Sequence, residues 1–381
     1  MSLLRFFRRL APPWRRAPIT RLNACLSACL SITAIIGHAP NALGADDLHA
    51  FASAHYNIHT DLSRRQTVPF GRHMDLLFGQ YERRFRQFGE TGPNPFPLYL
   101  LSNEPRYHRF MRSAGIAAEN SGGMFFVLPK RHGLATWTHG RSRSQTRRIL
   151  QHEGFHQFAF EHFGQRLPAW MNEGLAQYFE DAVLLDRGFE LGLADPDRIE
   201  RVRQSITNGS ALPLASLMKL ASKDWHHTLT TNDSRAGLLY AQSWSLVYFL
   251  IHGNHGMYQV SFENYLRYLG EGIDADNAFR RAFGTNAVPA IENHWRRWAR
   301  TQLPDAVTVA AARMTFLGEA LAYKSSRKEK QPKNLKQLQA DLQQRGFAIT
   351  RTVHELDLEL RADQPELYTY TRPGGEVSKF L

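Results

Sequence analysis

Residues 149–180 read ILQHEGFHQFAFEHFGQRLPAWMNEGLAQYFE, and this stretch determines most of what can be inferred about the chain. Apolar residues recur at helical spacing up to Phe163, and Gly164 ends that run. Pro168 follows shortly afterwards and is well suited to begin a new helix. We therefore predict helices over 144–163 and 168–185, with the second helix returning across the first.

The first of these helices carries two histidines with the spacing of a metal site. His152 and His156 are four residues apart, so both imidazoles lie on one helix face and can bind one zinc ion. Glu153 projects about 100° round the helix from His152, beside the metal. There its carboxylate can take a proton from a metal-bound water.

A third protein ligand is expected, because catalytic zinc takes three and keeps one position for water. Glu173 follows His156 by 17 residues, near the start of the second helix. The next residue, Gly174, has no side chain, which suits a close approach of two helices. The sequence thus predicts one zinc per chain, held by His152, His156 and Glu173.

Outside this stretch, strands come first and helices afterwards, which is typical of an α+β fold. We expect a domain over 46–302, then a helix and basic linker over 303–333 and a small α+β appendage over 334–381. Within the domain the apolar patterns predict strands at 55–60, 96–102, 124–128 and 134–138 and helices at 69–88, 104–113, 236–252, 261–269, 274–283 and 288–301. The appendage is expected to hold a helix at 334–345 and strand-like sequence at 348–360.

The N-terminal 45 residues have the pattern of a secretory signal peptide. Six arginines and no acidic residue lie there, followed by an apolar stretch at 22–37 and small residues at 42–45. We predict export, to a bacterial periplasm or exterior, and no stable membrane span after cleavage; an uncleaved anchor is the alternative. Both cysteines, Cys25 and Cys29, fall in this leader, so the mature part has no disulfide or thiol chemistry.

Composition and charge narrow the function classes. The chain has 381 residues, 43% of them hydrophobic and 22% charged, which excludes a disordered, collagen-like or multi-span membrane protein. The formal net charge is +12, and removing the six leader arginines leaves +6. A basic composition is typical of proteins that bind nucleic acid. However, the sequence has no base-reading motif and the predicted export disfavours such a partner, so we predict no nucleic-acid partner.

HEGFH followed by PAWMNEGLAQYFE resembles the gluzincin zinc metallopeptidases and, among them, the exported bacterial peptidase-MA-like proteins. The segment HYNIHTDLS at 55–63, the strand at 97–102, the Gly-Gly pair before the zinc helix and YAQSW at 240–244 are also similar, so the resemblance covers about 48–301. It implies a thermolysin-like catalytic domain with an N-terminal mixed sheet and a helical half.

The resemblance also implies an activity, the hydrolysis of peptide bonds in a peptide or protein substrate. His152, His156 and Glu173 would be the ligands, and Glu153 would activate a zinc-bound water and later protonate the leaving amine. The strand at 124–128 would be the edge strand that holds an extended peptide. Gln177 stands where thermolysin-like enzymes have an acid that supports a zinc-bound histidine, and it is a candidate for that supporting role.

Hydrolysis also needs a group that stabilises the oxyanion. Tyr240, on the helix expected at 236–252, is our first candidate, and His226 and His227 are the alternatives. His252 and His255 flank a glycine turn and are interpreted as helix-end residues. Two competing functions stay open: a zinc hydrolase acting on a cell-wall amide, and an exported non-catalytic binding module that retains the fold.

Overall fold

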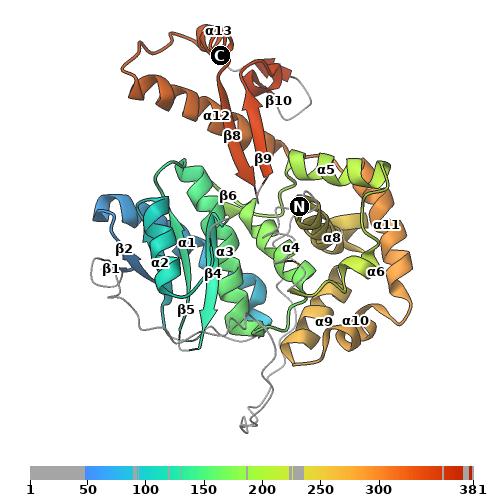
Figure 1. Ribbon diagram of the computed structural model, residues 1–381. Helices are drawn as coiled ribbons and strands as arrows, with labels where there is room; N and C mark the ends of the chain where they lie inside the picture. Colours follow the sequence, from blue (N-terminus) through green and yellow to red (C-terminus); the bar gives the residue numbers. More distant parts are fainter. Residues whose placement is uncertain are drawn as a thin grey trace.

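The computed structural model describes residues 48–379 apart from 89–91, 93, 119–120, 130, 186–187, 223–224, 226–235, 354–355 and 372–376. The predicted leader therefore lies outside the described residues. Among the residues that are described, no helix combines the length and apolar character needed to cross a membrane. The chain forms a mixed α+β domain with a smaller C-terminal unit above it in Figure 1.

A five-stranded mixed sheet forms the N-terminal half of the domain. Its order is β1-β2-β3-β5-β4, with β2, β3 and β5 parallel and with β1 and β4 antiparallel to their neighbours at the two edges. The four predicted strands are confirmed, and β1 is an addition. The bounds are β1 His49–Ala52, β2 Tyr56–Thr60, β3 Phe96–Leu101, β4 Gly123–Leu128 and β5 Arg131–Trp137.

Helices cover both faces of this sheet. Ile58, Leu98 and Leu134 point to the face that packs against α1 (Arg64–Phe85) and α3 (Arg143–Phe163), in the main hydrophobic core. Phe126 and Ala135 point to the other face, where the short helix α2 (Glu104–Ser113) covers them. This alternation follows from the period of two in a strand. It places the Phe125 side chain on the same face as Leu134, toward α3.

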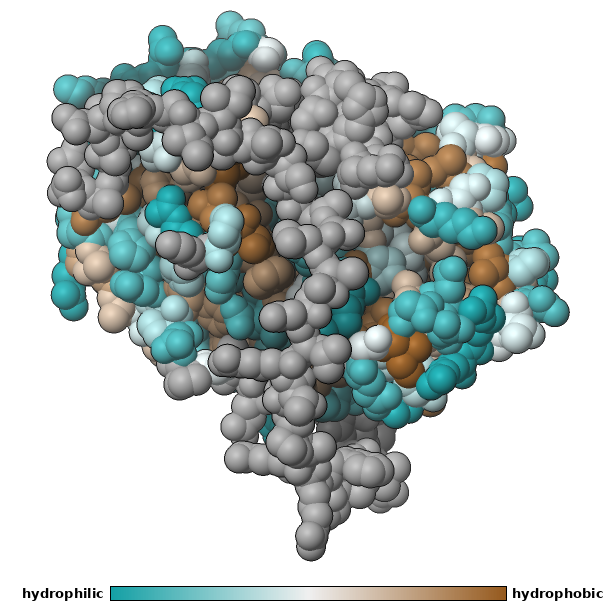
Figure 2. All heavy atoms as spheres, turned by 60° about the horizontal axis from the view of Figure 1, so that its bottom comes forward, coloured by the Kyte–Doolittle hydropathy of each residue, from teal (hydrophilic) through white to brown (hydrophobic). Residues whose placement is uncertain are grey.

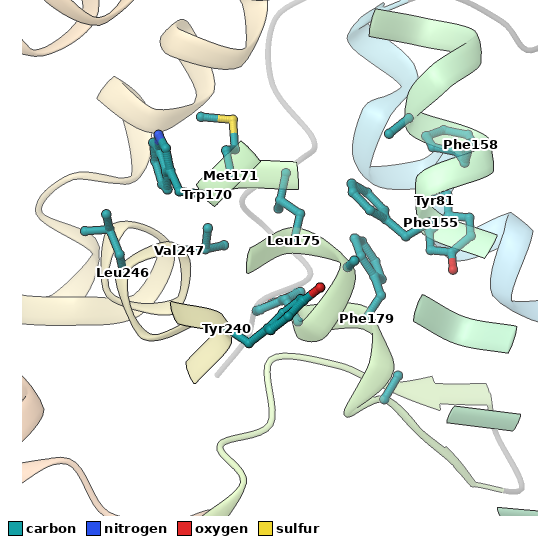
Figure 3. Close-up of a cluster of buried hydrophobic side chains, with 14 of the residues drawn as sticks. Tyr81, Phe155, Phe158, Trp170, Met171, Leu175, Phe179, Tyr240, Leu246 and Val247 are labelled. Atoms are coloured by element: carbon teal, nitrogen blue, oxygen red, sulfur yellow. The ribbon is translucent and has the colours of Figure 1, made fainter. Parts of the chain in front are cut away.

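The second half of the domain is helical. Side chains of α1, α3, α4 and α8 meet in one core, with Phe155 and Phe179 stacked at 5.1 Å between ring centroids (Figure 3). The bounds are α4 Ala169–Glu180, α5 Pro196–Thr207, α6 Leu214–Leu217, α8 Ala236–Gly256, α9 Gln259–Gly270, α10 Ala275–Phe283 and α11 Ala287–Thr301.

The helix predicted over 168–185 is shorter than expected. It ends at Glu180, and β6 (Val183–Leu185) and β7 (Gly188–Glu190) then form a hairpin. The Gln151 side chain of α3 explains the stop, because its Nε2 donates to the carbonyl oxygens of Phe179, Glu180 and Ala182. These carbonyls are satisfied by a tertiary contact, which the local pattern does not reveal. Helix α5 was likewise not predicted.

Gly174 permits a close helix approach, but the neighbour is not the one expected. A Cβ at this position would lie 2.6 Å from both the Ser243 carbonyl oxygen and the Val247 Cγ2 of α8. The close contact is therefore between α4 and α8. The result still matters for the site, because the α4–α8 contact sets the position of the adjacent residue, Glu173.

The C-terminal unit has its own small core. Phe316 and Ala320 of α12 (Ala306–Ser326) pack with Leu338 and Leu342 of α13 (Leu335–Gln344). The helix predicted in 303–333 thus belongs structurally to this unit, and only the segment after Ser326 is a connection. The remaining elements are β8 Ala348–Val353, β9 Leu356–Arg361, the 3-10 turn Pro365–Tyr368, β10 Thr369–Thr371 and β11 Val377–Lys379.

Candidate metal centre

Three donor atoms from α3 and α4 converge at one point. The Nε2 atoms of His152 and His156 lie 3.0 Å apart, and Glu173 Oε2 lies 3.4 Å from the first and 3.5 Å from the second. Helical spacing places the two imidazoles on one face, and the crossing of α4 brings the carboxylate to them. Within the described ranges, this is the one group of three or more His, Cys, Asp or Glu side chains arranged to hold a metal ion.

These separations fit zinc. Donors about 2.1 Å from a tetrahedral ion stand roughly 3.4 Å from one another, close to all three distances in the site. Two imidazoles and one carboxylate are also a donor set that zinc accepts in catalytic sites. The Oε2 atom of Glu173 and the Nδ1 atom of His156 are buried without a hydrogen-bond partner among the described residues. A cation between the three donors would engage the first of these.

A second carboxylate supports His152 from behind. Glu180 Oε2 lies 3.3 Å from His152 Nδ1, on the ring edge opposite the nitrogen that faces Glu173. Burial lowers the pKa of His152, but the neighbouring carboxylates of Glu173 and Glu180 outweigh it and raise that pKa to about 10. Carboxylates in this position orient a ligating imidazole and select its tautomer.

Two arginines hold Glu180 in turn. Arg148 Nη2 lies 2.9 Å from Glu180 Oε1, and Arg198 Nη2 lies 3.1 Å from Oε2. Both arginines also contact the buried Asp181. A buried carboxylate is stable only when paired in this way, so the network joins α3, α4 and α5 behind the histidine.

The sequence analysis missed Glu180 and assigned the supporting role to Gln177. The Gln177 side chain is buried and donates from Nε2 to the Tyr240 carbonyl oxygen at 3.0 Å, which ties α4 to α8 instead. A signal was present in the sequence, since Glu173 and Glu180 are the two acidic residues of this mostly apolar helix. The two arginines that stabilise it come from other elements, so local spacing alone did not point to it.

Glu153 faces the edge strand β4. Its Oε2 accepts a hydrogen bond from the Phe125 backbone N–H at 2.7 Å. Burial raises the pKa of Glu153 above its ordinary value, while nearby His152 and His156 hold part of that rise back. A carboxylate with a raised pKa, beside the three donors, has the properties of a proton acceptor.

Strand β4 stands at one end of the strand order, and among the described residues its one strand partner is β5 (Figure 1). Because Phe125 donates its N–H away from β5, the backbone groups of Phe125 and Val127 point to the outer edge. Hydrogen-bonding groups along such an edge can pair with an extended chain. The edge runs beside Glu153.

The other predicted site residues lie as follows. Tyr240 is a buried residue of α8; its ring meets Trp225 edge-on at 5.3 Å, and Figure 3 shows it against α4. These contacts do not test whether Tyr240 stabilises the oxyanion, so that role stays a prediction. His226 and His227 lie outside the described residues. His252 is bonded to the Tyr178 hydroxyl at 3.0 Å, and His255 follows in the kinked end of α8, in agreement with their interpretation as helix-end residues.

Comparison with known proteins adds one match. The model of a family described as "Protein of unknown function (DUF1570)" matches residues 148–271, from the second turn of α3 to just beyond α9. That range contains the three donors, Glu153, Glu180 and Tyr240. No curated protein matches the chain.

Proposed function

We propose that this chain is a zinc-dependent metallopeptidase of the gluzincin class, with a thermolysin-like catalytic domain, that hydrolyses peptide bonds in a peptide or protein substrate. The observation that carries the proposal is the convergence of His152, His156 and Glu173 beside Glu153, at the outer edge of β4. Because residues 1–45 have the pattern of a secretory signal peptide, we also propose that the protein is exported, to the periplasm or outside the cell.

His152, His156 and Glu173 would hold the zinc ion, with Glu180 orienting His152 through Nδ1. When bound there, zinc would polarise the carbonyl of the bond to be cleaved and acidify a water molecule. Glu153 takes the proton. Because its Oε2 accepts the Phe125 N–H, Oε1 is the oxygen that receives the proton and then delivers it to the leaving amine.

The edge of β4 supplies a binding mode for the substrate. An extended peptide can pair with the outward carbonyl group of Phe125 and with the outward backbone groups of Val127, which aligns its own backbone with the strand. This pairing uses groups common to all peptides and therefore suits an enzyme that acts on extended or unfolded chains. Tyr240 remains our candidate for stabilising the oxyanion.

The test combines metal content with turnover on the chain from Asp46 to Leu381. We expect near one zinc per chain by elemental mass spectrometry, a clear loss of zinc in Glu173→Ala, and hydrolysis of a quenched fluorescent peptide library. Glu153→Gln should keep zinc and lose at least about 10²-fold in turnover. Zinc binding without any hydrolysis of peptides would favour the binding module or a cell-wall amide hydrolase. Absence of zinc under zinc-replete conditions would overturn the proposal.

A further inference from the structure

Three aromatic rings form a partly exposed group beside Glu153. The ring centroids of Phe125 and Phe160 lie 5.6 Å apart, and His132 lies 6.0 Å from the first and 5.7 Å from the second. We call these three residues the aromatic cluster. Each keeps part of its surface accessible, whereas Phe155 and Phe158, on the opposite side of α3, are fully buried.

The cluster is continuous with the candidate catalytic site. Phe125 gives its backbone N–H to Glu153, and Phe160 lies one turn beyond His156, about 6 Å along the axis of α3. Gly123 packs against Ile149 and Phe125 against Glu153, so β4 and α3 run in the same direction. Both end at the lower side of the domain in Figure 1, the side that comes forward in Figure 2.

Strand geometry relates the cluster to a bound peptide. Side chains alternate between the two faces of a sheet, and Phe125 points to the α3 face. A peptide paired with the outer edge of β4 would continue the sheet, so every second side chain of that peptide would point to the same face. Cross-strand neighbours stand about 5 Å apart. The peptide side chain opposite Phe125 would therefore meet the aromatic cluster.

The charges around the cluster disfavour a polar side chain in that position. His132 Nε2 pairs with Glu161 at 3.0 Å, so this imidazole and this carboxylate satisfy each other. The other two members of the cluster are the Phe125 and Phe160 rings. Aromatic faces and edges gain most from apolar and aromatic partners, through burial and ring–ring contact.

We propose that the aromatic cluster is a specificity site that takes a bulky apolar side chain, such as Phe, Leu, Tyr or Met, at a position flanking the cleaved bond. This inference rests on the proposed function and deepens it by naming the substrate class. Apolar pockets discriminate side-chain size by about 10- to 200-fold. Peptides with Phe or Leu at one flanking position should accordingly be cleaved with a higher kcat/KM than matched peptides with Ala or Asp there.

The experiment measures this preference on two peptide series, varied at the residue before and the residue after the cleaved bond. Phe160→Ala should reduce the Phe-to-Ala ratio of kcat/KM about tenfold in one series and leave the cleavage of the Ala peptide near its original rate. Phe125→Ala keeps the N–H bonded to Glu153 and should also reduce the Phe-to-Ala ratio. Phe51→Ala removes a partly buried ring from β1, at the opposite edge of the sheet, and should leave the ratio unchanged.

Binding is measured separately on zinc-loaded Glu153→Gln, with the same peptides and fluorescence anisotropy. The double variant Glu153→Gln/Phe160→Ala should bind the Phe peptide about tenfold more weakly and the Ala peptide equally well. If the parent protein cleaves the peptides but neither cluster variant changes the Phe-to-Ala ratio of kcat/KM, the specificity site is overturned. The proposed function would be unaffected by that result. No cleavage of any peptide by the zinc-loaded parent would overturn both.

Discussion

The Oε2 atom of Glu180 lies 3.3 Å from the Nδ1 atom of His152, seven residues along α4 from Glu173. One short helix thus provides both a ligand candidate on one edge of the His152 ring and a supporting carboxylate on the other. This arrangement fixes which imidazole nitrogen faces the metal position. Arg148 and Arg198 make the arrangement possible, because they compensate the charge of Glu180 inside the protein.

Glu180→Gln should weaken zinc binding by about 10- to 100-fold, because His152 loses the carboxylate that orients it. The measurement is competition for zinc against a chelator of known affinity. Asp181→Asn is the matched control: it removes a carboxylate bound to the same two arginines but not in contact with His152. Both variants should unfold at lower temperature. An equal loss of zinc affinity in both would show that Glu180 acts only through stability.

Acidification should destabilise the fold through His73. Burial, and to a lesser extent the charge of Arg147, lower the pKa of His73 from 6.5 to about 4, although the bond to Gln151 opposes the shift. Below pH 6.5 the unfolded state therefore binds a proton at His73, whereas the folded state leaves this histidine neutral down to about pH 4. Stability is complete above pH 6.5 and falls as the pH decreases to 4, by about 3 kcal/mol for this group.

Replacing His73 by Gln separates this contribution from the titration of carboxylates. The amide can still donate to Gln151 but does not titrate in this range. Urea unfolding at pH 7.5, 6.0 and 4.5 should show a shallower decline for His73→Gln than for the parent protein. Parallel declines in the two proteins would mean that His73 is protonated equally in the folded and unfolded states.

The sequence predicted the parts of the site that depend on local geometry. The spacing of His152 and His156 gives their common helix face directly, and a glycine and a proline mark the turn that leads to Glu173. Glu180 was missed because its burial depends on Arg148 and on Arg198, which lies on the unpredicted helix α5. The β6–β7 hairpin was missed for a similar reason, since Gln151 of α3 ends α4 through a contact that is distant in sequence.

Gly174→Ala should destabilise the protein by about 1–3 kcal/mol. The new methyl group would meet the Ser243 carbonyl oxygen, a backbone atom of α8 that cannot rotate away. Gly79→Ala on α1 is the control, because its methyl group would meet nothing within 4 Å. That variant should gain up to about 1 kcal/mol from the lower backbone entropy of the unfolded chain. Chemical denaturation measures both changes.

Zinc content gives this comparison a second measurement. A shift of α4 away from α8 would move Glu173, so Gly174→Ala should also bind zinc more weakly, whereas Gly79→Ala should bind it like the parent protein. If Gly174→Ala is destabilised but binds zinc normally, then α8 moves to accommodate the methyl group and α4 does not. In that case the α4–α8 contact is not what positions Glu173.

Removing the C-terminal unit should leave the larger α+β domain folded. The unit has a separate core, and its connection includes hydrogen bonds from Ala194 N–H to Asp305 Oδ2 at 2.9 Å and from Thr308 Oγ1 to the Ala194 carbonyl oxygen at 3.0 Å. A chain of residues 46–304 loses these bonds, each worth about 1 kcal/mol. We expect a folded protein with normal zinc content and a melting temperature lowered by several degrees.

The double variant Asp305→Ala/Thr308→Ala in the full chain is the control, since it removes the same two bonds and retains the unit. It should lower the melting temperature by a similar amount. If the shortened chain is insoluble while this variant is stable, then the unit contributes to the core of the domain, and the boundary near residue 302 is wrong. Circular dichroism and elemental analysis of the two proteins, side by side, decide between these outcomes.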